Sequence, residues 1–334
     1  MDNLIKAELL KGLLGNPVHI PAWYPYDEEG SRLNDICMEQ CRWYYFHRFE
    51  MKILNDILTE LIEYLKDSRM LVDLGSGNAT KTMLILDRLL KTHESLTYVP
   101  VDISTEFLNK TAANLKTIYG NKLEIQPIGE EYMVALRKIK YVFYSVYLLF
   151  GNNFNWFTKI IVWFGSLQSL SYGKQLDYLL EIRNTMQVDD KLLITLDVTD
   201  TTCKQTIELA YLDPEGYSEN FHLNSIHRLN REMNANIDIS KFKIRNELVV
   251  NSRSNNCSYV NVWIEAIENC DVHIGQLDLT REFQKGERLY LHEENGISCK
   301  YTIEQLEYLL NKASLGMEKY WRNEHVAVIL VNRK

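Results

Sequence analysis

The chain has 334 residues, of which 46% are hydrophobic and 25% charged, proportions typical of a globular protein with a substantial core. Its 37 Lys and Arg against 45 Asp and Glu leave a net charge of −8, which argues against nucleic acid as a partner because nonspecific affinity for phosphates needs clustered basic residues. Aromatic residues make up 11% of the chain, so we expect either a ring-rich core or a binding pocket lined by rings.

Neither a metal site nor a membrane segment is expected from the sequence. The six cysteines form no CxxC pair and no zinc-ligand spacing, which predicts reduced thiols and no metal. The N-terminal segment is charged throughout and lacks the apolar core and cleavage site of a signal peptide. The most apolar stretch, residues 141–170, is interrupted at residues 151–155, so neither half reaches the ~20 residues of a membrane span. We therefore expect a cytoplasmic protein without a membrane partner.

Strands and helices alternate along the middle of the chain. The apolar spacing of residues 50–65 predicts a helix that precedes the first strand. Predicted strands then cover residues 70–74, 96–101, 123–128, 160–164 and 191–197, and predicted helices cover residues 80–90, 107–118 and 176–186. This order implies a parallel, doubly wound sheet.

From residue 200 to about residue 287 the pattern changes. A helical stretch at residues 224–234 is followed by alternating strands around residues 247–250 and 259–266, which indicates an inserted antiparallel region. A helix at residues 303–313 and a strand at residues 326–331 then resume the first pattern. We predict two domains, one formed by residues 60–199 and 288–334, the other by residues 1–59 and 200–287.

The first predicted strand ends in a glycine loop, Asp73-Leu74-Gly75-Ser76-Gly77. Glycines at this place let the backbone approach a ligand closely. Asp102 ends the second strand, where a carboxylate can accept both ribose hydroxyls of an adenosine. Position 80 is Thr, so the dinucleotide fingerprint GxGxxG is incomplete, and no P-loop is present. The DxGxG form favours S-adenosylmethionine (SAM) over NAD; an ordinary strand-to-helix turn is the alternative.

Several segments together resemble the ergothioneine-pathway histidine α-N-methyltransferase family. They occur in the family's order between residues ~20 and ~330, which chance does not supply. The matching segments are Tyr26-Asp27 with Gly30-Ser31, Tyr44-Tyr45 with Arg48 and Glu50, the loop Leu74–Thr82, Tyr98 to Asp102, Phe164 to Ser166, Tyr211, Asn230 to Glu232, and Ser298 to Tyr301.

The resemblance implies an α/β fold: a Rossmann-like class I methyltransferase sheet with a second, α+β substrate-binding domain. It also implies roles for particular residues. Those that would hold SAM are Tyr26, Gly75, Ser76, Gly77, Lys81, Asp102 and the acidic pair Glu130 and Glu131, although the family has Asp-Phe where the pair stands. Those near the substrate would be Tyr44, Tyr45 and Tyr211, as catalytic residues, with Gly165, Ser166, Gly296 and Ser298 as binding residues.

Two departures from the family bear on the substrate. After Gly165-Ser166 the family continues to an Asn that grips the substrate's carboxylate and amine, and this Asn is missing here. Histidine-specific members carry a Glu that bonds the imidazole where this chain has Gly296. The absence of that Glu argues against histidine as the substrate. A buried imidazole without a hydrogen-bond partner would be costly, and such costs discriminate strongly between substrates. Relatives that methylate an indole amino acid are also Gly-like at this position.

The prediction is therefore a SAM-dependent N-methyltransferase that acts on the α-amino group of an amino acid or a related aromatic amine. The alternatives are histidine trimethylation of the ergothioneine type and a non-catalytic SAM-binding relative. We expect a small-molecule substrate and a monomer or weak homodimer. An aromatic stretch at residues 141–157 has no counterpart in the family pattern and is either additional core or part of a pocket or interface.

Overall fold

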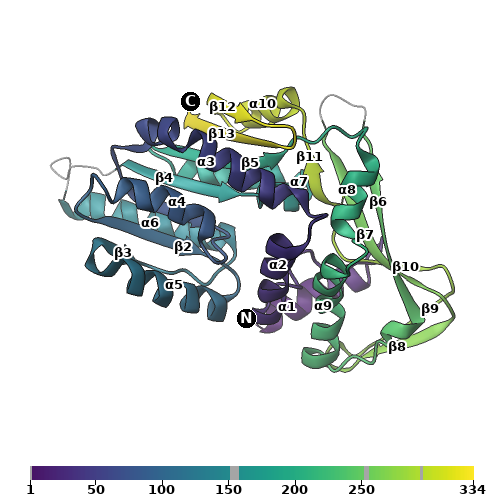
Figure 1. The fold of residues 1–334 in the computed structure, drawn as a ribbon. Helices are drawn as coiled ribbons and strands as arrows, with labels where there is room; N and C mark the ends of the chain where they lie inside the picture. Colours follow the sequence, from purple (N-terminus) through teal and green to yellow (C-terminus); the bar gives the residue numbers. More distant parts are fainter. Residues whose placement is uncertain (1, 151–157, 252–255, 294–295) are drawn as a thin grey trace.

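The computed structural model describes residues 2–150, 158–251, 256–293 and 296–334, with residues 142–150 described by their backbone alone. A seven-stranded sheet forms its centre, in the order β12-β13-β5-β4-β1-β2-β3 (Figure 1). The strands are β1 (Ser68–Leu74), β2 (Leu96–Val101), β3 (Leu123–Ile125), β4 (Thr158–Phe164), β5 (Lys191–Asp197), β12 (Leu315–Arg322) and β13 (Val326–Arg333). Strands β1 to β5 are parallel, and β13 runs antiparallel to both β5 and β12.

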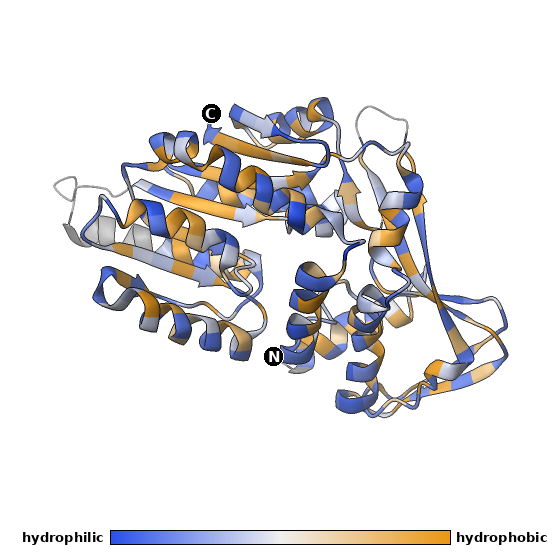
Figure 2. Ribbon diagram, viewed as in Figure 1, coloured by the Kyte–Doolittle hydropathy of each residue, from blue (hydrophilic) through white to orange (hydrophobic). Residues whose placement is uncertain are grey.

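Helices cover both faces of this sheet because its strands are apolar on both sides. On β4, Ile160, Val162 and Phe164 share one core with α3 (Tyr45–Leu65) and α4 (Thr80–Leu89), whereas Ile161 and Trp163 share another with α6 (Tyr132–Phe150), α7 (Tyr172–Thr185) and α10 (Ile303–Lys312). The helix α5 (Thr105–Tyr119) connects β2 to β3. Figure 2 shows the result: the central strands are largely hydrophobic, and the helices carry hydrophilic outer faces.

The strand order reverses at β1. The chain moves from β1 outward to β2 and β3, then crosses back through α6 to place β4 on the other side of β1. The carboxyl ends of β1 and β4 therefore diverge, which is where ligands bind in open α/β sheets. This switch point lies beside the glycine loop.

A second unit packs beside the main sheet (Figure 1). Its sheet is antiparallel, with β7 (Ser258–Ala266) between β6 (Phe242–Val249) on one side and β10 (Arg288–Tyr290) and β11 (Ile297–Lys300) on the other. A separate hairpin joins β8 (Cys270–Ile274) to β9 (Leu279–Phe283). The accompanying helices are α1 (Asp2–Leu13), α2 (Glu28–Gln40), α8 (Lys204–Tyr211) and α9 (Tyr217–Glu232).

Helix α9 fixes the segment that precedes α2. The Asn224 side chain donates to the Pro25 carbonyl at 2.7 Å and to the Asp27 carboxylate at 2.8 Å. Arg228 donates to the Tyr24 carbonyl at 2.8 Å, and Arg231 forms an ion pair with Asp27. Tyr26, the residue between these anchors, is thereby held in one place.

Most of the predicted elements are confirmed, two of them with the predicted bounds: the strands at residues 96–101 and 191–197. The third strand is shorter than predicted and ends at Ile125, with Ile128 joined to Val101 by one isolated bridge. Strand β12, which pairs with β13, was not predicted.

The aromatic stretch at residues 141–157 divides into two parts. Residues 141–150 form the second half of α6, the ordinary crossover helix between β3 and β4, and Tyr141 is exposed. Residues 151–157 lie outside the described residues, so the proposed pocket or interface role of the stretch stays a prediction. Within the described part of the chain, no helix combines the length and apolarity that crossing a membrane requires.

Two buried histidines of the second unit predict acid sensitivity. Burial lowers the pKa of His222 and of His292 to about 4. Their pKa in the unfolded chain is near 6.5, so between pH 6.5 and 4 the unfolded state binds protons that the folded state does not. Each histidine should then cost the folded state about 1.4 kcal/mol per pH unit over that window.

A His292→Gln variant isolates this effect in denaturant unfolding between pH 7 and pH 4.5. The wild-type and variant unfolding free energies should converge as the pH falls below 6.5. Asp35 and Asp73, whose pKa burial raises to about 6, act with the opposite sign but equally in both proteins and so cancel. A constant difference between the two proteins would contradict the prediction.

Candidate active site

The glycine loop follows β1 at the switch point, and two of its residues have left-handed backbone. Gly75 has φ +75°, and a Cβ there would lie 2.6 Å from the Tyr132 hydroxyl and 2.9 Å from Ser166 Oγ. Gly77 has φ +50°, yet a Cβ there would meet nothing within 4 Å. The loop therefore packs closely against α6 and the end of β4 at Gly75, and it leaves open space beside Gly77.

Asp102 faces this open space from the end of β2. Its carboxylate accepts hydrogen bonds from the backbone N–H of Gly77 at 3.1 Å and of Ser104 at 2.9 Å. Burial raises the pKa of Asp102, and these N–H groups oppose the rise. A carboxylate fixed in this way keeps lone pairs for a ligand, as the ribose role predicted from the sequence requires.

Asp73, the acidic residue of the DxGxG motif, does not face the open space as Asp102 does. Asp73 is buried, and its carboxylate accepts from the Thr82 hydroxyl at 2.5 Å and from the Tyr98 hydroxyl at 2.8 Å. It joins β1, α4 and β2 beneath the loop. Its contacts are thus with the protein's own hydroxyls.

Lys81, on α4, is paired with a buried carboxylate. Its Nζ lies 3.0 Å from Glu50 Oε2 and 3.5 Å from the Phe164 carbonyl oxygen. Glu50 is only 1% exposed and also accepts a hydrogen bond from Thr195. A Cβ at Gly165 would lie 3.8 Å from Glu50, so Lys81 and Gly165 lie near the same carboxylate at the end of β4.

Glu130 and Glu131 differ in their surroundings. Glu130 forms an ion pair with Lys138. Glu131 accepts hydrogen bonds from the Tyr178 hydroxyl at 2.5 Å and from the Met133 backbone N–H at 2.8 Å, at the start of α6. Their predicted contact with the adenine stays a prediction.

Three tyrosines from distant parts of the chain come together: Tyr26, Tyr44 and Tyr211, here called the tyrosine cluster. The rings of Tyr44 and Tyr211 meet edge to face, with their centroids 6.4 Å apart. Tyr26 packs on Phe221 at 5.1 Å. Burial raises the pKa of all three hydroxyls, and for Tyr26 the nearby Tyr132, Asp102 and Tyr211 add to the rise. The cluster is therefore neutral at physiological pH and lies between Asp102 and β11.

Behind the cluster lies a buried ion pair that sequence reasoning missed as a site. Lys300 Nζ lies 2.9 Å from the Asp197 carboxylate, and both side chains are at most 1% exposed. Burial by itself would lower the pKa of Lys300, but its charge interactions and hydrogen bonds with Asp197 and Tyr211 together outweigh burial, and the pKa is raised. Lys300 also donates to Ser298 Oγ at 2.8 Å and to the Tyr211 hydroxyl at 3.2 Å. Tyr211 in turn bonds Ser298.

Tyr45 belongs to this buried network. Its hydroxyl donates to Asp197 at 2.7 Å, and its ring lies 4.6 Å from that of His325. Of the two neighbouring tyrosines at the start of α3, Tyr44 thus joins the cluster and Tyr45 supports the ion pair. A catalytic role for Tyr45 stays a prediction, and its proton is already donated to Asp197.

Gly296 and Ser298 both have left-handed backbone, with φ +67° and +54°. A Cβ at Gly296 would lie 2.2 Å from the Tyr259 ring and 2.7 Å from the Val260 carbonyl oxygen of β7. Any side chain at residue 296 would therefore disturb the pairing of β7 with β11. The backbone itself explains why this position is glycine.

The residues after Gly165 and Ser166 have a structural role in this chain. Gln168 is buried and accepts a hydrogen bond from the Asp197 backbone N–H at 2.6 Å. Leu170 is followed by α7. The segment that holds an Asn in the family thus serves here to fix the end of β5.

The predicted site residues form two neighbouring groups. Around the loop lie Gly75, Ser76, Gly77, Lys81, Asp102, Gly165 and Ser166, and around β11 lie Tyr211 and Ser298, with Tyr44 against Tyr211. Tyr26 lies between the two groups, near Asp102, Tyr132 and Tyr211. Glu130 is turned to a surface ion pair. Asp197 and Lys300 carried a signal, since each ends an apolar strand with a charge, but their pairing depends on the tertiary fold.

Comparisons with known proteins bear on the whole chain. A family model described as "Histidine-specific methyltransferase, SAM-dependent" matches residues 5–333. Histidine N-alpha-methyltransferase from Mycobacterium tuberculosis (strain CDC 1551 / Oshkosh) is 26% identical over 321 residues, which are 96% of this chain and 91% of that protein. A 4-dimethylallyltryptophan N-methyltransferase from Trichophyton verrucosum (strain HKI 0517) is 29% identical over 116 residues, which are 35% of this chain and 34% of that protein.

Among solved structures, magnesium protoporphyrin IX methyltransferase from Synechocystis PCC 6803 aligns with a TM-score of 0.46 and 6% identity. The alignment covers 92% of this chain and 96% of that one.

The open space beside Gly77 predicts a matched pair of variants. Gly77 and Gly216 both have left-handed backbone, and a Cβ at either meets nothing within 4 Å. Gly77→Ala and Gly216→Ala should therefore each cost about 1–2 kcal/mol of stability, the strain of an L-residue in that conformation. In calorimetric titration, Gly77→Ala alone should weaken SAM binding, by roughly tenfold or more. Equal SAM affinity in the two variants would show that the loop does not contact the cofactor.

The Lys300 network predicts strong coupling between its two charges. Lys300→Met leaves the Asp197 carboxylate buried without its cation and should lower the unfolding free energy by about 3–5 kcal/mol. Adding Asp197→Asn should restore part of that loss, because the amide oxygen can still accept from the Thr199 N–H while the amide NH2, in place of the second oxygen, can donate to the Tyr45 hydroxyl. Denaturant unfolding of the two single variants and the double variant gives the coupling. Additive losses would contradict it.

Proposed function

The chain belongs to the family of SAM-dependent, histidine-specific methyltransferases, and we propose that it methylates the α-amino group of an amino acid or related aromatic amine other than histidine. The enzyme class and the use of SAM follow from the family. The substrate and the residue roles are our proposal. The observation that carries it is the tyrosine cluster, which lies between the carboxylate at the end of β2 and the hydroxyl of Ser298 on β11.

The cofactor end of the site fits SAM without a phosphate-binding turn. Gly77 offers free backbone, and Asp102 offers a fixed carboxylate for the ribose hydroxyls. Ser76, Lys81 and Tyr26 complete the proposed set of holding residues. When bound, SAM supplies an activated methyl group on a sulfonium centre. The residues of this chain contribute by positioning the amine and excluding water.

The tyrosine cluster suits an amine nucleophile. Because their pKa values are raised, Tyr26, Tyr44 and Tyr211 stay protonated, so each hydroxyl can accept a hydrogen bond from the amine. Tyr26 and Tyr44 can also donate one to the substrate's carboxylate, whereas Tyr211 donates its proton to Ser298. Lys300 donates to Tyr211, which fixes the orientation of that hydroxyl. Ring faces next to the amine also favour the positive charge that develops on nitrogen.

The proposal that histidine is not the substrate rests on Gly296. The family's Glu at this position would bond an imidazole, and in this chain the left-handed backbone and the contact with Tyr259 leave no room for a side chain. Simply restoring Glu at residue 296 would disrupt β11 and so would not test the substrate. An aromatic ring beside Gly296 is better suited to a flat apolar side chain, such as the indole of the tryptophan-type substrate in the Trichophyton verrucosum relative's name.

Mass spectrometry of candidate substrates tests the proposal. The purified protein with SAM should add one, two or three methyl groups to an aromatic amino acid such as tryptophan or tyrosine, and far fewer to histidine. Tyr211→Phe keeps the ring and removes the hydroxyl, so it should slow the accepted substrate roughly tenfold or more. Efficient trimethylation of histidine would overturn the substrate proposal. A Tyr211→Phe variant with unchanged kinetics would overturn the role of the cluster.

A further inference from the structure

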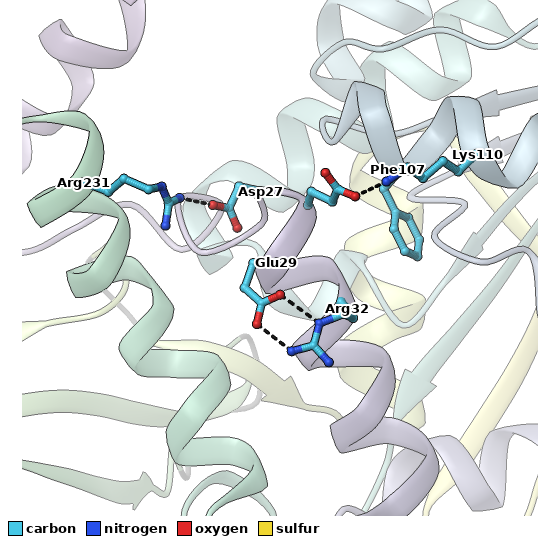
Figure 3. A pocket seen from close by; sticks show the side chains of 7 residues that line it. Asp27, Glu29, Arg32, Phe107, Lys110 and Arg231 are labelled. Atoms are coloured by element: carbon cyan, nitrogen blue, oxygen red, sulfur yellow. Dashed lines mark hydrogen bonds and ion pairs between the residues drawn. The ribbon is translucent and has the colours of Figure 1, made fainter.

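Helix α2 lies between the two units, and the acidic side chains at and just before its start, Asp27, Glu28 and Glu29, are matched by cations. Beside it lies a groove of about 410 Å³ between α2, α5 and α9 (Figure 3). Glu28 pairs with Lys110 of α5, and Asp27 pairs with Arg231 of α9, whereas Glu29 pairs with Arg32 within α2 itself. These pairs tie the start of α2 to both units and neutralise its carboxylates.

Asp35, two turns further along α2, differs from them. Its carboxylate accepts a hydrogen bond from Asn78 Nδ2 at 3.2 Å and has no ion pair with any residue in the described ranges. Asn78 directly follows Gly77, and its own side-chain oxygen caps the start of α4 through the Thr80 N–H at 3.1 Å. A carboxylate can accept about four hydrogen bonds, so Asp35 brings unused acceptor capacity to the glycine loop.

The charges around Asp35 are mostly of its own sign. Glu39 and Asp102 repel its ionised form, and Lys81, the nearby cation, is already paired with Glu50. Apart from that pair, Asp35 and Asp102 are two partly buried negative charges beside the loop, while the charge of Glu39 is exposed and screened by water. A positively charged ligand would balance these carboxylates, and a neutral ligand would not.

We propose that Asp35 is an additional cofactor-binding residue, which acts as the counter-charge to the cationic methionine end of SAM. SAM carries two positive charges there, the sulfonium and the α-ammonium, and one carboxylate. A carboxylate offered from α2 also links cofactor binding to the helix that follows Tyr26. The inference rests on SAM as the cofactor and does not depend on which amine is methylated.

The competing explanation is that Asp35 only ties α2 to the loop through Asn78. Asn at residue 35 would keep an acceptor for Asn78 and remove the charge, so Asp35→Asn separates the two explanations. A carboxylate that contacts the cation should matter in proportion to the ligand's positive charge. One that only ties the helix should affect all adenosine ligands equally.

The experiment is calorimetric titration with SAM, S-adenosylhomocysteine, which lacks the sulfonium charge, and 5′-methylthioadenosine, which lacks both charges. Asp35→Asn should weaken SAM binding by roughly tenfold or more, and methylthioadenosine binding by less than about twofold. The loss for S-adenosylhomocysteine assigns the contact: a loss as large as that for SAM points to the ammonium, and a smaller one to the sulfonium.

Two further variants act as controls. Glu39→Gln removes an exposed carboxylate one turn along the same helix and should leave all three affinities within about twofold of the wild type. Asp35→Glu keeps the charge and should recover most of the preference for SAM. Equal losses for the three ligands with Asp35→Asn, or no loss for SAM, would overturn the proposal. Wild-type binding of SAM is measured in the same series, so a failure of the site itself is distinguishable.

Discussion

Lys300 and Asp197 meet where the last residue of β11 comes against the last residue of β5, and the proposed substrate site is arranged around that contact. A buried ion pair is weak evidence for stability, because desolvation of two charges offsets most of their attraction. This pair instead fixes the orientation of the hydroxyl groups that bond to it. Asp197 accepts from Tyr45, and Lys300 donates to Tyr211 and Ser298. One contact between the two sheets thus positions hydroxyls from α3, α8 and β11.

The proton arrangement within that network follows from what each group can do. An ammonium only donates, so both Tyr211 and Ser298 accept from Lys300, while the hydrogen bond between them uses just one of their two protons. The pair therefore has one hydroxyl proton left for another acceptor. If the substrate is an amino acid, as proposed, one of its oxygens can accept this proton, and the pocket gains a donor without carrying an exposed charge.

The parts of the fold that were predictable are those with strong local patterns. The strands at residues 96–101 and 191–197 are mostly apolar, the first followed by Asp102 and the second ending in Asp197, and the loop between β1 and α4 needs glycine for its left-handed backbone. Helix α6 was missed because its aromatic second half hides the helical period, and β12 because its alternating polar residues resemble a surface loop. The Lys300–Asp197 pair and the Asp35–Asn78 contact join residues 103 and 43 positions apart, and a single sequence carries no signal for such pairings.

Position 296 carries the proposed substrate preference through its backbone. By motif alone, Gly296 is a lost Glu, a change of one residue on an otherwise equivalent strand. In the fold it is a change of backbone, because φ is +67° and any Cβ would stand 2.2 Å from the Tyr259 ring, which excludes every other residue. The strand would have to adopt another path before an acid could stand there. The proposed substrate preference is consequently tied to how β11 pairs with β7, and the irregular pairing between Ile297 and Lys300 also includes Ser298, which bonds Tyr211. Under that proposal, one strand irregularity both leaves no place for an acid that would bond an imidazole and positions the hydroxyl network around Tyr211.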